Sequence, residues 1–383
     1  MRKTGFLCAA EEFDMSEEAK HLVIAAAGTG GHVFPALAVA RELIARGWKV
    51  TWIGTKTGME GGLIAKSAPE IDFVPLDFRG VRGKGLFGAV TGVVKLLKAT
   101  AKSKQLMRDL KPDVFFTTGG YIAVPVNNGA KKNHVRTVIM NCDADLLMST
   151  EMILRDAWAV ACGFAGSARS RAASKGYITG NPVRREIEAV PAPEERLAGR
   201  SGPLKLLVFG GSLGAQVLNE TVPKALALFE EDKRPQVLHQ CGAKQIEAAK
   251  KCYADAGVKA DVVGFIDDMA AAYRDADLVI CRSGATTTAE LCASGSAAVM
   301  VPFVVKTTQH QMGNARYLAS RGAGILLEQA HLTPEHLFGL LASIKREKIL
   351  DMAVKARGLM KPHAAQTVAD LIETVRCMKE KPV

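Results

Sequence analysis

One structural unit occurs twice in this chain, and this repeat constrains the fold more than any other feature. Residues 22–31 and 206–214 each read as a short apolar run followed at once by a glycine-rich turn, and a helical pattern follows both turns. A strand, a turn and a helix in this order begin a Rossmann-like sheet. Two such units, about half a chain apart, predict two domains of this kind rather than one large sheet.

Short runs of strand-forming residues alternate with helical stretches in both halves. This alternation is typical of parallel sheets covered by helices on both faces, so the predicted fold class is α/β. The first helix is predicted from Phe34 to Arg46, with Pro35 in its first turn and Gly47 just past its end. Strands are predicted at residues 22–27, 49–53, 114–117 and 137–140, and at 204–209, 236–240, 261–263, 278–281 and 297–301.

The length of 383 residues suits two domains. A proline-containing stretch at 180–202 is the predicted linker, and the expected site is a cleft between the sheets, because ligands bind beyond the carboxyl ends of parallel strands. We divide the chain into a loose N-terminal extension at 1–18, an N-terminal Rossmann-like domain at 19–183, a C-terminal Rossmann-like domain at 184–362, and a last helix at 363–383 that packs back on the N-terminal domain.

The net charge of +11 is concentrated in one segment. Between Arg79 and Lys111 there are nine lysines and arginines against one acid, Asp109. Such a block favours an anionic partner, which can be a lipid head group, a nucleic acid or a diphosphate, or it is simply a solvated basic face. Aromatic residues make up only 6% of the chain and form no stacking platform in this block, which argues against nucleic acid.

The eight cysteines form no CxxC pair and no metal-like cluster. This usage is typical of reduced thiols in a cytosolic protein, so we expect neither disulfides nor a bound metal. No apolar run approaches the roughly 18–20 residues that a membrane-spanning helix needs. A short apolar patch near the N-terminus is followed at once by acidic residues, which argues against a secretory signal.

The turn Gly28-Thr-Gly-Gly-His32 follows the first predicted strand and opens a helix. Exposed backbone N–H groups and the helix dipole make such a turn an anion site, although a merely tight turn has the same sequence signature. It is not a dinucleotide fingerprint, because the third glycine position holds Val33. His32 lies where the dipole disfavours its protonation, so a neutral imidazole can serve as a general base, or it has a structural role.

Three segments of the second half follow predicted strands and carry polar side chains. Ser212 in the second glycine turn suits a diphosphate or caps the helix. Glu290 can accept hydrogen bonds from a ribose diol or can answer the helix dipole. The segment 309–314 is rich in amides and imidazole, which recognise sugar hydroxyls, or it is a solvated loop. The threonines before Glu290 can cap their helix or face a phosphate, and they are Thr286, Thr287 and Thr288.

Taken together, these motifs resemble the MurG family of N-acetylglucosaminyltransferases, which make the second lipid-linked precursor of peptidoglycan. The likeness covers residues 21–375 and is far more specific than any single motif. The matching segments are Gly28-Thr-Gly-Gly-His-Val-Phe-Pro-Ala-Leu-Ala-Val-Ala40, Arg79-Gly-Val-Arg-Gly-Lys-Gly85, Gly119-Gly-Tyr-Ile-Ala-Val-Pro125, Gly180-Asn-Pro-Val-Arg184, Gly210-Gly-Ser-Leu-Gly-Ala215, Phe265-Ile-Asp-Asp-Met269, Cys281-Arg-Ser-Gly-Ala285 and His310-Gln-Met-Gly-Asn-Ala315.

The resemblance implies a GT-B fold, an inverting mechanism, UDP-N-acetylglucosamine as donor, an undecaprenyl-linked acceptor, and no metal or other cofactor. It places the acceptor on the N-terminal domain and the UDP-sugar on the C-terminal domain. Carried over by position, the donor is met at the uracil by Ile266, along the nucleotide by Ala285, Thr286, Thr287, Thr288, Ala289 and Glu290, at the diphosphate by Ser212 and Arg184, and at the sugar by His310 and Gln311. On the opposite wall lie Thr29, Gly30 and Gly31.

In this chemistry an acceptor hydroxyl attacks the anomeric carbon as UDP leaves, so a base must take the proton and donors must meet the diphosphate charge. We expect His32 to be the base. The aliphatic residues interleaved with lysines in 79–111 then form a surface that rests on anionic lipid. The protein is expected to be peripheral, on the cytoplasmic face of the bacterial inner membrane. The expected process is the synthesis of the cell wall.

One loop departs from the family pattern. The family carries His-Glu-Gln-Asn after the strand predicted at 137–140, whereas this chain reads Asn141-Cys-Asp-Ala144. The family's asparagine falls on Ala144, and Asn141 or Asp143 can substitute for it if the loop shifts. The alternatives are therefore a related GT-B enzyme with another acceptor, a UDP-sugar epimerase, or a catalytically weakened UDP-sugar-binding protein.

Overall fold

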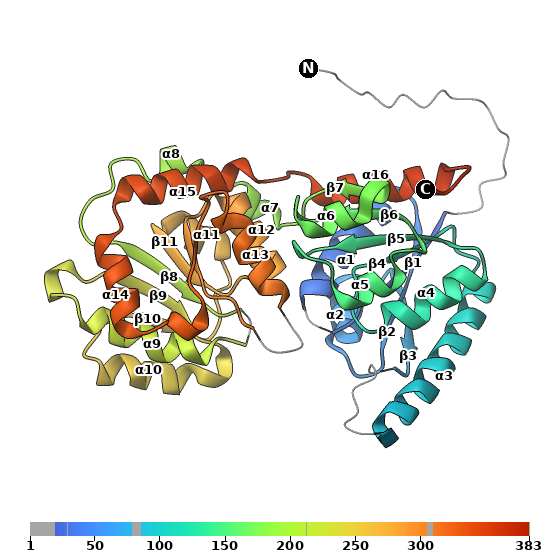
Figure 1. Cartoon of the computed structure of the whole chain (residues 1–383), viewed down its shortest axis with the longest axis horizontal. Helices are drawn as coiled ribbons and strands as arrows, with labels where there is room; N and C mark the ends of the chain where they lie inside the picture. The colour runs from blue at the N-terminus through green and yellow to red at the C-terminus, as the bar shows by residue number, and fades with distance from the viewer. Residues whose placement is uncertain (1–19, 29, 79–85, 212, 305–308, 383) are drawn as a thin grey trace, which may run out of the picture.

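Two parallel sheets lie side by side in the computed structural model, which describes residues 20–28, 30–78, 86–211, 213–304 and 309–382, with side chains omitted at 86–90 (Figure 1). The first sheet has the strand order β3-β2-β1-β4-β5-β6-β7. Its strands are β1 (His21–Ala25), β2 (Lys49–Thr55), β3 (Asp72–Leu76), β4 (Val114–Thr117), β5 (Arg136–Asn141), β6 (Ala157–Cys162) and β7 (Gly176–Ile178).

The second sheet repeats this topology. Its order is β10-β9-β8-β11-β12-β13, which again places the third, second and first strands before the fourth, fifth and sixth. Its strands are β8 (Lys205–Phe209), β9 (Gln236–Gln240), β10 (Asp261–Val263), β11 (Leu278–Cys281), β12 (Ala298–Met300) and β13 (Ile325–Leu326). The prediction of two Rossmann-like parallel sheets is confirmed, although β3, β6, β7 and β13 were not predicted.

Helices cover both faces of each sheet (Figure 1). In the first domain they are α1 (Gly30–Ala45), α2 (Met59–Ser67), α3 (Leu86–Leu110), α4 (Ala123–Lys132), α5 (Met148–Ile153) and α6 (Ser167–Ala172). The linker and the second domain carry α7 (Arg185–Glu188), α8 (Pro193–Arg196), α9 (Gln216–Ala227), α10 (Ile246–Asp255), α11 (Met269–Asp275), α12 (Ala285–Ser294), α13 (His310–Ala319), α14 (Pro334–Ser343) and α15 (Arg346–Gly358), and the last helix is α16 (Ala364–Cys377).

The pleat of the central strand explains this layering. Successive side chains of β1 point to opposite faces, so Leu22 and Ile24 enter one core while Val23 and Ala25 enter another. All four side chains are fully buried. A strand that is apolar on both faces can be stable only between two helix layers, and this requirement places β1 at the centre of its sheet.

The first helix begins earlier than predicted. It starts at Gly30 instead of Phe34, so Pro35 lies in its second turn. Proline has no N–H to bond the carbonyl one turn back, which costs one hydrogen bond. Pro35 is buried, and the helix continues through it.

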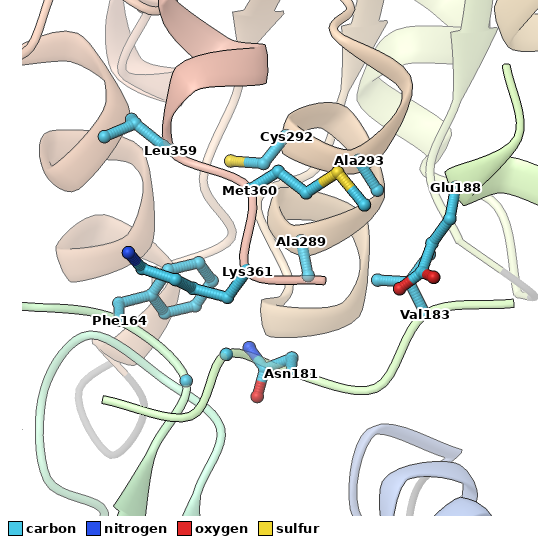
Figure 2. A pocket seen from close by; sticks show the side chains of 12 residues that line it. Phe164, Asn181, Val183, Glu188, Ala289, Cys292, Ala293, Leu359, Met360 and Lys361 are labelled. Atoms are coloured by element: carbon cyan, nitrogen blue, oxygen red, sulfur yellow. The ribbon is translucent and has the colours of Figure 1, made fainter. Parts of the chain in front are cut away.

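The chain crosses between the domains twice, at neighbouring places. Gly180 on the outgoing crossing has a φ of +79°, and a Cβ there would collide with Lys361 on the returning crossing. The Asn181 side chain donates to the carbonyl of Cys142 at 2.8 Å. A small pocket lies at this point, lined by residues of both domains, with Asn181 and Lys361 facing it from the two crossings (Figure 2).

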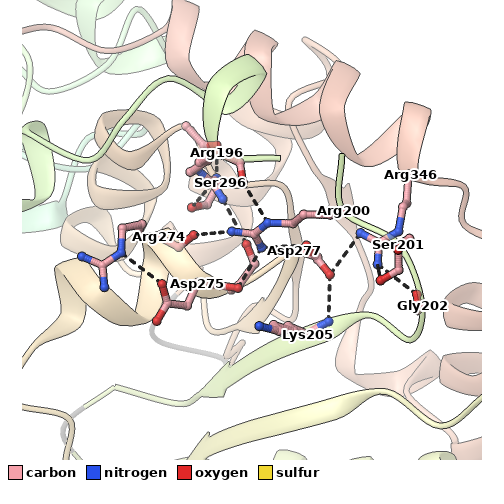
Figure 3. Close-up of polar contacts among 12 residues, drawn as sticks. Arg196, Arg200, Ser201, Gly202, Lys205, Arg274, Asp275, Asp277, Ser296 and Arg346 are labelled. Carbon is pink, nitrogen blue, oxygen red and sulfur yellow. Dashed lines mark hydrogen bonds and ion pairs between the residues drawn. The ribbon is translucent and has the colours of Figure 1, made fainter. Parts of the chain in front are cut away.

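The segment after the first crossing is fastened to the second domain by arginines (Figure 3). Arg200 pairs with the buried carboxylate of Asp277 at 2.8 Å, and Arg346 pairs with the other oxygen at 3.2 Å. Arg196 donates to the carbonyls of Ala276 and Gly295. These bonds make residues 185–202 part of the second domain in packing as well as in sequence.

The last helix returns to the first domain. In Figure 1, α15 lies over the second domain and α16 continues along the same side over the first. Arg46 at the end of α1 pairs with Asp370 and Glu373 of α16 at 2.6 and 2.8 Å. Trp48 donates to Glu373 at 3.1 Å. The helix thereby closes one face of the first sheet.

Among the residues that the structure describes, no helix is long and apolar enough to cross a membrane. Within the same residues, no group of three or more histidine, cysteine or acidic side chains is placed to hold a metal ion.

Candidate active site

The predicted site residues come from loops at the carboxyl ends of strands in both domains. In the first domain these loops follow β1 and β5, and Arg184 lies in the crossing after β7; in the second domain they follow β8, β10, β11 and β12. Thr29, Ser212 and residues 79–85 lie outside the described residues. Gly30 and Gly31 form the first turn of α1, and a Cβ at Gly30 would press against the ring of Phe34.

His32 lies in the first turn of α1 and is partly buried. Its Nδ1 lies 2.9 Å from the carbonyl oxygen of Thr118, and the Thr118 hydroxyl donates to the His32 carbonyl at 2.8 Å. A carbonyl only accepts, so Nδ1 carries the proton and Nε2 is left with a lone pair. The ring is therefore held in the tautomer that a general base needs.

The electrostatics of this ring come from both domains. Burial holds the pKa of the His32 imidazole below its ordinary value, the Asp143 carboxylate and the Thr118 carbonyl raise this pKa, and His310 of the second domain lowers it. Because burial has the largest effect, the ring is neutral at neutral pH. Asp143 and His310, from the two sides of the site, are thus close enough to His32 to affect its charge.

The loop that departs from the family pattern is internally bonded. The Asn141 amide donates to the carbonyls of Asp143 and Asp145 at 2.7 and 3.0 Å and accepts from the backbone N–H of Leu147. Asn141 is fully buried. Its side chain therefore shapes the loop from inside, and the loop presents Asp143 and Asp145 toward the second domain.

Asn314 of α13 joins this loop to the second domain. Its Nδ2 donates to Asp143 Oδ1 at 2.7 Å and to the carbonyl of Ser283 at 3.0 Å, while its Oδ1 accepts from the backbone N–H of Ala144 at 2.8 Å. Asn314 is fully buried. One side-chain amide thus links a loop of the first domain to a loop of the second through three hydrogen bonds.

The donor-sugar candidates lie at the start of the same helix. His310 is the first residue of α13 and Gln311 the second. The backbone N–H of Phe303 donates to Gln311 Oε1 at 2.9 Å, and Ser283 donates to the Gln311 carbonyl at 2.8 Å. The first bond engages the amide oxygen of the Gln311 side chain, and the second ties the backbone at the start of α13 to the loop after β11.

Glu290 of α12 is buried and has two partners. Arg184 donates to its Oε1 at 3.2 Å, and the Tyr273 hydroxyl donates to its Oε2 at 3.1 Å. Burial raises the pKa of Glu290, while Arg184 and Tyr273 lower it. The structure therefore brings together Arg184 and Glu290, which the sequence placed in one site, and adds Tyr273.

The first turn of α12 lies beside this carboxylate. Thr286 and Thr287 are partly exposed, whereas Ala285 and Ala289 are buried. The Thr288 hydroxyl donates to the Gly284 carbonyl at 3.0 Å, so it serves the helix itself. Ile266 is partly buried in the loop before α11. The N–H groups of the first turn of α12 remain available for an anion.

Sequence reasoning missed Tyr273, Thr118 and Asn314 as parts of the site. Tyr273 follows the segment Phe265–Met269 on a helix of alanines and charged residues that carries no motif, and Thr118 is one of two adjacent threonines before a glycine pair. Asn314 lies inside a motif that was matched, but its partner, Asp143, lies 171 residues away. Only the folded chain reveals such pairings.

Two Rossmann-like parallel sheets, with polar loops of both domains at the carboxyl ends of their strands, are the GT-B architecture of glycosyltransferases. The N-terminal domain model of glycosyltransferase family 28 matches residues 22–161, and its C-terminal domain model matches residues 205–375. The chain belongs to glycosyltransferase family 28 and, within it, to the MurG family.

Full-length relatives support this assignment. Proteins of Methylibium petroleiphilum and Chromobacterium violaceum, both named UDP-N-acetylglucosamine–N-acetylmuramyl-(pentapeptide) pyrophosphoryl-undecaprenol N-acetylglucosamine transferase, are each 47% identical, over 92% of this chain and 97% of theirs. The crystal structure of Acinetobacter baumannii MurG matches with a TM-score of 0.80 at 38% identity, over 93% of this chain and 99% of that one. A UDP-N-acetylglucosamine 2-epimerase from Listeria monocytogenes, at 16% identity and a TM-score of 0.62, shares the fold alone.

Proposed function

We propose that this chain transfers N-acetylglucosamine from UDP-N-acetylglucosamine to the 4-hydroxyl of undecaprenyl-diphosphate-linked N-acetylmuramoyl-pentapeptide, a step of peptidoglycan synthesis. The observation that carries this proposal is the near full-length similarity to relatives named for this transfer, at 47% identity. The paired geometry supports it, since a group able to take a proton and a group able to hold a nucleotide lie on opposite sides of one site.

His32 is the general base of this proposal. Its Nε2 accepts the proton of the acceptor hydroxyl as the oxygen bonds to the anomeric carbon and the bond to UDP breaks, with inversion at that carbon. The hydrogen bond from Nδ1 to Thr118 keeps the ring in place. Asp143, whose charge acts on this imidazole, stabilises the imidazolium that forms.

The departing diphosphate is met by the second domain. The first turns of α12 and α13 offer backbone N–H groups, and Arg184 and Ser212 add a guanidinium and a hydroxyl. Ile266 contacts the uracil, Glu290 accepts from the ribose, and His310 and Gln311 bind the hydroxyls of the sugar. Thr29, Gly30 and Gly31 line the acceptor side. In this proposal no metal is needed, because these groups carry the charge.

The acceptor is a lipid, so the enzyme must work at a membrane surface. On α3 the side chains of Val93, Val94 and Leu97 are 53%, 46% and 63% exposed, an unusual degree for aliphatic residues. Lysines interleave with them, at positions 95, 98 and 102. We propose that this helix, with the basic residues of 79–111, rests on anionic lipid at the cytoplasmic face of the inner membrane as a peripheral contact.

The deciding assay combines the purified chain, UDP-N-acetylglucosamine and the lipid-linked muramoyl-pentapeptide, and follows UDP release together with the mass of the lipid product. Transfer of one N-acetylhexosamine to the lipid is the expected result. Isomerisation of the UDP-sugar without an acceptor would identify an epimerase instead, and tight UDP binding without turnover would identify a binding protein.

A further inference from the structure

The carboxylate of Glu290 is held between two donors from different parts of the chain. Arg184 reaches it from the crossing between the domains, and Tyr273 reaches it from α11. A buried carboxylate without partners is costly and tends to become protonated. Each oxygen of Glu290 has one donor, so the group can remain ionised in a buried position.

Tyr273 is fully buried, and its ring packs edge-on against Phe209 at the end of β8, with centroids 6.1 Å apart. A phenylalanine ring would fill this space equally well. The hydroxyl is therefore not required by the packing, and it donates a hydrogen bond of 3.1 Å to Glu290 Oε2. This bond fixes the direction in which that oxygen presents its remaining lone pair.

An ionised carboxylate has about four acceptor positions, two on each oxygen. Arg184 and Tyr273 occupy one on each oxygen, which leaves one on each for a ligand. Two acceptors spaced in this way match the vicinal hydroxyls of a ribose. A carboxylate free to rotate would meet the same diol only part of the time, and ordering it would reduce the affinity.

We propose that Tyr273 is a positioning residue for the nucleoside: its hydroxyl holds Glu290 so that both carboxylate oxygens accept from the 2′- and 3′-hydroxyls of the donor's ribose. This inference rests on the proposed function, in which Glu290 meets that ribose. Tyr273 also ties two binding segments together, because α11 begins directly after the loop of Ile266 and Glu290 lies in α12. The uracil and the ribose would thus be bound by two segments that this one hydrogen bond holds together.

The test compares UDP with 2′,3′-dideoxy-UDP by calorimetry, with no acceptor present, for the whole chain and for Tyr273→Phe. We expect Tyr273→Phe to bind UDP about tenfold more weakly, the scale of one hydrogen bond to a charged group. With 2′,3′-dideoxy-UDP the two proteins should agree within about twofold, because the hydroxyls through which Tyr273 acts are missing. In turnover the donor KM should rise while the acceptor KM stays unchanged.

Tyr253→Phe is the matched control. Tyr253 is also buried in the second domain, and its hydroxyl bonds His239 Nδ1 at 2.8 Å. Its loss should cost stability without changing UDP affinity. Equal UDP binding by Tyr273→Phe and the wild type would overturn the inference, and so would an equal loss toward UDP and the dideoxy analogue. A wild-type chain that binds no UDP would instead refute the proposed donor, and with it the function on which the inference rests.

Discussion

The two halves of the site are built on the same topology and carry different chemistry. In the first domain, the turn after the first strand leads to His32, a titratable ring whose tautomer is set by Thr118. In the second domain, the corresponding turn is Gly210-Gly-Ser-Leu-Gly214, which has no titratable side chain. There the ionisable group is Glu290, which lies in the helix after β11, the strand that neighbours β8 in the sheet. In the proposed function, one half of this repeated topology serves proton transfer and the other serves nucleotide binding.

The carboxylates of the two halves differ in the same way. Glu290 is paired with a cation and a phenol within its own surroundings. Asp143 is bonded by the neutral amide of Asn314, which comes from the other domain. In the proposed function, the first carboxylate binds the ribose, and the second lies beside the general base and is bonded by the other domain. The predictions below would break or sharpen this division.

The largest effect is expected for His32→Ala. Loss of a general base lowers kcat by about 10²-fold or more, and UDP affinity should be unchanged if donor binding belongs to the other half. Single-turnover rates and UDP calorimetry on the same preparation check this. A near-normal rate would reject His32 as the base, and a parallel loss of UDP affinity would reject the division between the halves.

Glu290→Gln should have the opposite signature. The amide keeps the shape but presents one acceptor oxygen and no charge, so the donor KM should rise by about tenfold to a hundredfold. The acceptor KM should remain as in the wild type. Steady-state kinetics with each substrate varied in turn measures both KM values. A rise confined to the acceptor KM would show that Glu290 serves acceptor binding, which contradicts the proposed division.

Asn314→Ala tests the connection between the halves. It removes three hydrogen bonds that join Ser283 of the second domain to the loop of Asp143 and Ala144. We expect kcat/KM to fall by about tenfold, because the base and the donor site lose their common support. Ser320→Ala, at the exposed end of the same helix, is the control. Wild-type turnover in Asn314→Ala would show that the halves need no such link.

The membrane contact is expected to belong to the first half alone. Leu97→Glu on α3 should reduce co-sedimentation with anionic vesicles by about tenfold, since burial of a leucine in the lipid interface is lost. Activity toward a water-soluble acceptor analogue should be retained. Val354→Glu places the same charge on α15 at another partly exposed aliphatic position and is the control. If both variants bind vesicles equally well, α3 is not part of the membrane contact.

The smallest effect is a shift in the pH profile. A base acts when unprotonated, so kcat/KM should fall as pH drops through the pKa of His32, which burial places below 6.5. Asp143 raises this pKa, so Asp143→Asn, which can still accept from Asn314, should move the acidic limb to lower pH. Rates near pH 8 should fall only modestly, because the imidazolium that forms loses the nearby charge of Asp143. A shift in the opposite direction would contradict the placement of Asp143 beside the base.

The parts of the fold that could be predicted are those with a strong local signal. Buried parallel strands are short apolar runs between turns, and residues 114–117, 236–240 and 278–281 were predicted with the bounds that the structure has. The glycine turn within each of the two repeated units was recognisable because positions such as Gly28, with a φ of +109°, require glycine.

The missed strands have weak or misleading signals. The edge strand β3 contains Pro75, which is disfavoured in strand interiors. Strand β6 reads Ala-Trp-Ala-Val-Ala-Cys, and alanine favours a helix. Strands β7 and β13 have only three and two residues. In these places the sheet, rather than local preference, decides the conformation.

The site could be predicted residue by residue only where a family motif marked it. Nothing in the sequence joins Asn314 to Asp143 or Tyr273 to Glu290, because such contacts depend on how distant elements pack. The departure from the family pattern at 141–144 illustrates this limit. From sequence, Asn141 was a candidate ligand contact; in the structure its amide donates hydrogen bonds to carbonyls within its own loop.

The return of α16 to the first domain has a consequence for synthesis of the chain. The helix buries Val368, Leu371, Ile372 and Val375 against a sheet made more than 200 residues earlier. During translation the second domain can complete its core first, while the first domain keeps one apolar face uncovered until α16 has left the ribosome. The domain that is made first is therefore the last to be finished.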